Sequence, residues 1–170
     1  MTHTMIEPLA AVATPETLRT AYGRFPTGVV AVCADVDGTR EVLVASSFVT
    51  VSLDPPLVAF FPQKTSTTWP RLAHAGRLGV SILAEHQHTL ARSMASKNGD
   101  RFAGAEVVAG NEGALFVGGA SAWLETTVDG VVPTGDHDCV LLRVEGAALH
   151  EPGPTVFHTS RFQRLVDLDA

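Results

Sequence analysis

Short runs of apolar and β-branched residues, separated by turn and breaker signals, recur along this chain and limit what it can fold into. They predict strands over residues 29–34, 42–52, 57–61, 78–83, 122–128 and 139–151, and a short one over 156–158. An Asp-Gly turn lies within residues 35–39, and residues 131–136 join the two longest strands. Asp54-Pro55-Pro56 interrupts the pattern because proline cannot donate to a sheet ladder.

Helical signals are fewer. Thr14 and Pro15 predict the start of a short helix whose apolar face runs from Leu18 to Phe25 and which stops before Pro26. A second short helix is expected near residues 68–73 and a third over 86–96, with Gly99 as its left-handed cap. Residues 100–119 are expected to be looser. The prediction is a mainly β fold with short helices (α+β), built as a closed or nearly closed barrel, since closure removes exposed sheet edges.

Length and composition narrow the class of protein. The 170 residues, 45% hydrophobic and 18% charged, predict one domain over residues 14–170 behind a flexible arm at 1–13. A net charge of −6 with scattered cations argues against nucleic-acid and membrane-surface partners. The N-terminus lacks a basic start followed by an apolar stretch, and apolar runs fall short of the roughly 18 residues that span a bilayer. We therefore expect a cytoplasmic protein.

Several common sites are not predicted. Cys33 and Cys139 each lie in an apolar run, so reduced buried thiols are expected rather than a disulfide. His86 and His88 are two apart in a helical pattern and face different ways, so no metal site is expected. The chain has no G-x-G-x-x-G fingerprint, no P-loop and no G-x-S-x-G elbow. A nucleotide cofactor would therefore need a binding site of another kind.

Residues 44–58, VASSFVTVSLDPPLV, are the most specific sequence motif in the chain. It closely resembles the flavin reductase domain family, small NAD(P)H-dependent enzymes that supply reduced flavin to two-component monooxygenases. Further matches follow in chain order over about residues 18–166: FPTGV at 25–29, KTSTTW at 64–69, GVSIL at 79–83, DRF at 100–102 and GDH at 135–137.

The resemblance implies an FMN-binding split β-barrel that forms a homodimer, uses FAD or FMN with NADH or NADPH, and passes reduced flavin to a separate monooxygenase. It places the flavin ring edge along the backbone of Val44, Ala45, Ser46 and Ser47. It assigns the flavin phosphate to Lys64, Ser66 and Thr68, on one side of an extended segment. The remaining cofactor contacts that it implies are Thr27, Thr65, Arg101, Gly135 and Asp136. His137 is placed beside the nicotinamide, in a positioning role, and His158 near the active site.

Each of these runs also has a purely structural interpretation. The hydroxyls between Ser46 and Ser52 fit exposed strand positions, and Ser66 or Thr67 fits a helix N-cap. Arg101 could hold a loop, and His137 could pair with Asp136 or Asp138.

The chain departs from the family pattern at Val42-Leu43-Val44, where many members have Gly-Leu-Thr or Gly-Met-Thr. A missing hydroxyl at Val44 costs one hydrogen bond, about 0.5 to 1.5 kcal/mol, which would retune flavin preference. Two other functions use the same barrel: a resident flavin acting on an organic substrate, and a flavin-binding electron carrier without enzymatic activity. The GDH turn at 135–137 favours the nicotinamide-dependent reductase.

Overall fold

The computed structural model describes residues 14–168. The predicted arm at residues 1–13 lies outside the described residues, and the division into an arm and one domain stays a prediction. Within the described residues, no helix is both long and apolar enough to cross a membrane.

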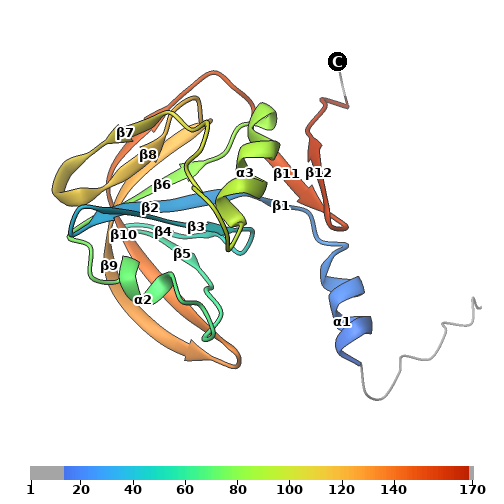
Figure 1. Cartoon of the computed structure of the whole chain (residues 1–170). Coiled ribbons are helices and arrows are strands. Elements are labelled where there is room, and N and C mark those ends of the chain that lie inside the picture. Colours follow the sequence, from blue (N-terminus) through green and yellow to red (C-terminus); the bar gives the residue numbers. More distant parts are fainter. Residues whose placement is uncertain (1–13, 169–170) are drawn as a thin grey trace, which may run out of the picture.

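Seven strands form one antiparallel sheet in the order β3-β2-β6-β9-β10-β5-β4. The strands are β2 (Val30–Val36), β3 (Thr39–Ala45), β4 (Val49–Leu53), β5 (Pro56–Phe60), β6 (Leu78–Ile82), β9 (Ala122–Thr134) and β10 (His137–Leu149). The sheet curls so that its two edge strands, β3 and β4, are joined by only three residues (Figure 1). No ladder pairs β3 with β4 in the described sheet, so the barrel is split at this point. The predicted fold class is confirmed.

Two smaller sheets complete the strands. One contains β1 (Thr27–Gly28), β11 (Thr155–His158) and β12 (Arg161–Arg164), and the other pairs β7 (Val107–Ala109) with β8 (Leu115–Val117). The expectation of a loose stretch over 100–119 was therefore wrong for β7 and β8, and β12 was missed. Strands of three or four residues are too short for a periodic signal, and the sequence of β12, RFQR, is mostly polar.

The strand predicted over 42–52 is two strands. The ladder of β3 ends at Ala45, which pairs with Val30, and β4 begins at Val49, which pairs with Ala59. The chain crosses the barrel opening in between, and sequence periodicity does not register this change of neighbours. The join predicted over 131–136 is shorter than expected: residues 131–134 continue β9, and Gly135-Asp136 form a two-residue turn with Gly135 at φ +62°.

The helices are α1 (Pro15–Tyr22), α2 (Trp69–Leu72), α3 (His88–Ala95) and the short 3-10 turns η1 (Glu85–Gln87) and η2 (Asn111–Gly113). Thr14 caps α1 as predicted, since its Oγ1 accepts from the N–H of Thr17 at 3.2 Å. Phe25, however, lies beyond the end of α1, which stands apart from the barrel and buries no residue (Figure 1). Gly99 is left-handed at φ +80°, but Ser96 caps α3, so Gly99 serves a later turn.

Two apolar clusters lie on the two faces of β2. Phe60, Leu72, Val80 and Leu142 belong to the cluster that fills the barrel, where Phe60 meets Trp69 edge-on at 5.3 Å between ring centroids. The second cluster lies outside, under α3 and the β7–β8 hairpin. Strand β2 is buried on both faces, which explains its unbroken apolar run.

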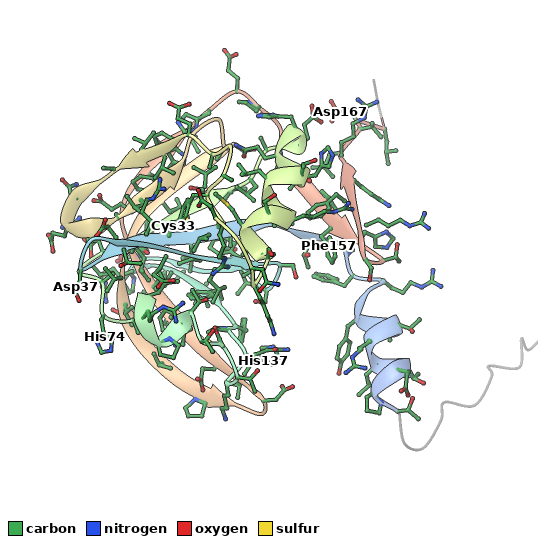
Figure 2. All side chains as sticks on the ribbon, viewed as in Figure 1. Cys33, Asp37, His74, His137, Phe157 and Asp167 are labelled. Carbon is green, nitrogen blue, oxygen red and sulfur yellow. The ribbon has the colours of Figure 1, made fainter. Side chains whose placement is uncertain are left out.

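Both cysteines are free thiols, but the expected burial holds for Cys33 alone. Cys33 is fully buried in the outer cluster, deep inside the body in Figure 2, and burial raises its thiol pKa to about 12. Cys139 is half-buried.

Candidate functional site

A cleft of about 720 Å³ opens at the split between β3 and β4. Its volume is in the range of small-molecule and cofactor sites. Its walls come from β3 with the crossing that follows, the segment between β5 and α2, α2 itself, the end of α3 with the loop after it, and the start of β10. The lining positions are 41, 43–47, 61–63, 65–68, 71, 95–97, 101 and 137.

Residues 44–47 line the cleft at the split. Val44 and Ala45 end β3, and the described sheet has no ladder partner for Ser46, Ser47 or Phe48. The Ser47 hydroxyl accepts from the N–H of Phe61 at 3.1 Å and lies 3.3 Å from its carbonyl oxygen, so it tethers the crossing to the chain beyond β5. The crossing therefore lines the cleft with a backbone that no ladder uses, and the Ser47 hydrogen bond holds it in place. A flavin ring edge, with its carbonyl and nitrogen atoms, fits such a surface.

The segment from Gln63 to Thr68 makes one hydrogen-bonded turn over Gln63–Ser66 and then bends at Thr67 and Thr68, so the extended segment predicted there is wrong. The N–H of Ser66 donates to the Gln63 carbonyl at 2.8 Å, and Thr68 is in the helical region at φ −88°. Ser66 Oγ accepts from the N–H of Trp69, the first residue of α2, at 3.1 Å. The N-cap residue of α2 is Thr68, whose side chain makes no capping hydrogen bond, so neither Ser66 nor Thr67 is the N-cap. Turning places Thr65, Ser66, Thr67 and Thr68 on the cleft wall, and this arrangement is compatible with an anion at the start of α2.

Lys64 points elsewhere. Its Nζ donates to the Gly135 carbonyl at 2.7 Å, and Lys64 is not among the residues that line the cleft. This contact and two backbone bonds, from Lys64 N to Asp136 O and from Asp138 N to Pro62 O, tie the β9–β10 turn to the segment after β5. In the structure, Lys64 therefore fixes the turn that carries His137.

Arg101 links two walls of the cleft. Its Nε donates to the Met94 carbonyl at 2.7 Å, and its Nη1 donates to Thr68 Oγ1 at 3.2 Å. Burial lowers the pKa of the Arg101 guanidinium; Glu41 acts in the opposite direction and Arg71 in the same direction. Arg101 both holds the end of α3 and faces the cleft, so its two predicted roles are compatible.

Glu41 and Arg71 form an ion pair in the cleft wall that the sequence interpretation missed. Arg71 Nε and Nη2 both donate to the Glu41 carboxylate, the latter at 3.0 Å, and Arg71 Nη1 donates to the Thr67 carbonyl at 2.6 Å. The hydrogen bond with Glu41 raises the pKa of Arg71. In the sequence, Glu41 is a charged residue beside the apolar run of β3, which could have indicated a buried ion pair. Its partner Arg71 is 30 positions away, so the sequence pattern did not identify the pair.

His137 lines the cleft from the start of β10, at the end of the β9–β10 hairpin in Figure 2. Its Nδ1 donates to Asp136 Oδ1 at 2.7 Å, which is the predicted pairing. This hydrogen bond lowers the pKa of the exposed Asp136 carboxyl. A neutral imidazole with Nδ1 as donor has Nε2 as its acceptor.

Some predicted positions lie away from the cleft. Thr27 is in the small β1 sheet, with Oγ1 3.5 Å from the Phe157 carbonyl oxygen. Gly135 and Asp136 support His137 without lining the cleft, and His158 is in β11. The described residues contain no group of three or more His, Cys, Asp or Glu side chains suited to a metal ion.

Comparison with known proteins adds an independent observation. The sequence profile described as "Flavin reductase like domain" matches residues 22–166. The chain is 37% identical over 142 residues to a flavin reductase from Pseudomonas putida, covering 83% of this chain and 84% of the relative. It is 32% identical over 149 residues to HsaB of Rhodococcus jostii, the reductase subunit of a flavin-dependent monooxygenase, covering 87% of this chain and 76% of that protein.

Solved structures share the fold. The NADH:FAD oxidoreductase SgcE6 of Streptomyces globisporus C-1027, solved with NAD and FAD fragments, superposes with a TM-score of 0.87 at 31% identity. The match covers 95% of this chain and all of that one.

Proposed function

Because the chain belongs to the flavin reductase-like domain family, we propose that it is an NAD(P)H:flavin oxidoreductase that supplies reduced flavin to a separate monooxygenase. The observation that carries the proposal is the cleft at the barrel split. It brings together residues 44–47, the guanidinium groups of Arg71 and Arg101, and His137.

The cleft suggests how FAD or FMN would bind. The ring edge would lie along the backbone of Val44 to Ser47, and the phosphate would lie near the turns at residues 65–68 with Arg101. These turns end at α2, and hydroxyl and guanidinium groups are suitable donors for a phosphate. Lys64 would contribute indirectly, because its hydrogen bond to Gly135 fixes the turn before His137. Thr27 has no cofactor role in this proposal, since it lies in a different sheet.

His137 would orient the nicotinamide. With Nδ1 donating to Asp136, its Nε2 can accept from a carboxamide N–H and hold the nicotinamide ring over the flavin. When bound, the flavin would supply the two-electron acceptor for the hydride that NADH or NADPH gives up. The chain's own contribution is to align the two rings and to exclude water between them.

A second copy of this chain is the proposed partner in a homodimer. Tyr22 and Phe25 are 70% and 74% exposed, and α1 buries none of its residues. Tyr22 ends α1 and Phe25 follows it, and large exposed aromatic side chains on such a projecting segment are typical of an interaction surface. Light scattering should give the mass of a dimer, and Tyr22→Ser with Phe25→Ser should shift it toward the monomer. A wild-type monomer at micromolar concentration would refute the dimer.

The deciding experiment is a steady-state matrix of NADH and NADPH against FAD, FMN and riboflavin, following nicotinamide oxidation. We expect oxidation well above the uncatalysed rate with at least one pair. Gel filtration after turnover then tests whether flavin leaves the protein, as transfer to a monooxygenase requires. Flavin that stays bound through turnover would favour the resident-flavin alternative, and flavin binding without nicotinamide oxidation would favour an electron carrier. A cytoplasmic location stays a prediction from the sequence.

A further inference from the structure

The Glu41–Arg71 ion pair occupies an unusual place for such a pair, in the wall of the cleft. The Glu41 side chain is only 10% exposed, whereas that of Arg71 is 50% exposed. The carboxylate takes two of the five guanidinium N–H groups, and the Thr67 carbonyl takes a third. Arg71 is therefore fixed from behind by Glu41, with part of its guanidinium toward solvent.

The charges around this pair favour an anion. Among the described residues that line the cleft, Lys97, Arg101 and Arg71 are the cations and Glu41 is the one carboxylate. Glu41 offsets one of these three cations. A flavin phosphate would meet a weaker positive field than three cations alone would produce, because opposite charges a few ångströms apart largely cancel at longer range.

On the basis of the proposed function, we infer that Glu41 is a positioning residue that limits how tightly the cleft holds the flavin phosphate, acting through Arg71. A reductase that passes reduced flavin to another protein must release it, so a wall with too much positive charge would slow turnover. Glu41 keeps Arg71 in the cleft wall while cancelling most of its charge at the phosphate. The flavin is thereby an exchangeable ligand.

Three variants vary the charge of the pair. Glu41→Gln gives it a charge of +1, Arg71→Gln gives −1, and the double variant restores the wild-type value of zero. The probes are FMN and riboflavin, which differ by the phosphate alone, and the measurement is the dissociation constant of each by fluorescence titration. Relative to wild type, we expect Glu41→Gln to bind FMN about fivefold more tightly and Arg71→Gln about fivefold more weakly. The double variant should remain within about twofold, and riboflavin should change by less than about twofold throughout.

A matched control is Glu125→Gln, which breaks another poorly exposed Glu–Arg pair, with Arg77, away from the cleft. It should leave both dissociation constants unchanged. Weaker FMN binding in all three cleft variants would mean that the pair is only framework, and equal changes for riboflavin would mean that the phosphate is not involved; either result overturns the inference. If Glu41→Gln does not fold, Arg71→Gln and the double variant still give the comparison. If the protein is an active flavin reductase but its FMN dissociation constant does not follow the charge of the pair, only this inference is refuted. If the wild-type protein binds no flavin, the proposed function is refuted as well.

Discussion

Replacing Gly79 with alanine should destabilise the protein through a clash of backbones. Gly79 lies in β6 between its ladder partners Cys33 and Glu125. A Cβ atom built there would lie 2.1 Å from the Leu115 carbonyl oxygen and 2.7 Å from its carbonyl carbon. Both atoms are backbone, so no side-chain rotation relieves the contact. Either β8 must move away from β6, or β6 must leave its ladder.

The size of the effect follows from that choice. Overpacked cores typically lose about 1 to 3 kcal/mol, and an obstacle made of backbone belongs at the upper end, so we expect a loss of about 3 kcal/mol. For a domain of this length, that loss lowers the melting temperature by about 6 to 12 °C. In urea, the unfolding midpoint should fall by about 1 M or more. Both transitions can be followed by circular dichroism.

Gly146→Ala is the matched control, since Gly146 also lies in a strand, β10, and a Cβ there would meet no heavy atom within 4 Å. This variant should stay within about 0.5 kcal/mol of wild type. If Gly79→Ala lost less than about 1 kcal/mol, or no more than Gly146→Ala, the packing of β8 over β6 described above would be refuted.

Three further predictions concern single side chains. His137→Ala should slow hydride transfer in stopped flow at least about tenfold while leaving the flavin dissociation constant within about twofold, and an unchanged rate would remove His137 from the mechanism. At pH 8, a disulfide reagent should modify Cys139 in the native protein but Cys33 only after denaturation, because burial raises the pKa of Cys33 to about 12; two thiols reacting equally fast would contradict this. Hydrogen bonds from Asn111 lower the pKa of Glu125 below its usual 4.5, so its ionised form stabilises the fold above about pH 4.5 and that stability is lost as the pH falls. Urea unfolding between pH 3 and 7 should show a smaller acid loss in Glu125→Gln, and parallel curves would contradict the assignment.

Local patterns predicted much of the fold correctly. The β-branched runs located β2, β5 and β6 because each is a short apolar segment bounded by turn residues, and such signals need no knowledge of distant neighbours. The Thr14 cap is likewise a contact between residues three apart. The run over residues 44–58 also pointed to the correct family, since a long motif carries that information in its letters.

Contacts between distant residues were beyond such patterns. The Glu41–Arg71 pair, the Lys64–Gly135 contact and the approach of His137 to the barrel split join residues 30 or more positions apart. A local sequence pattern does not identify the segment that packs against it in the fold. For this reason Lys64 was assigned to the phosphate and Glu41 was overlooked. The alternation of residues 64–68 in the sequence is compatible with an extended segment, but the structure has a turn that begins at Gln63. Short-range propensity therefore chose the strands and caps of this protein, whereas the curling of the sheet, which brings β3, β5 and β10 to one opening, assembled the site.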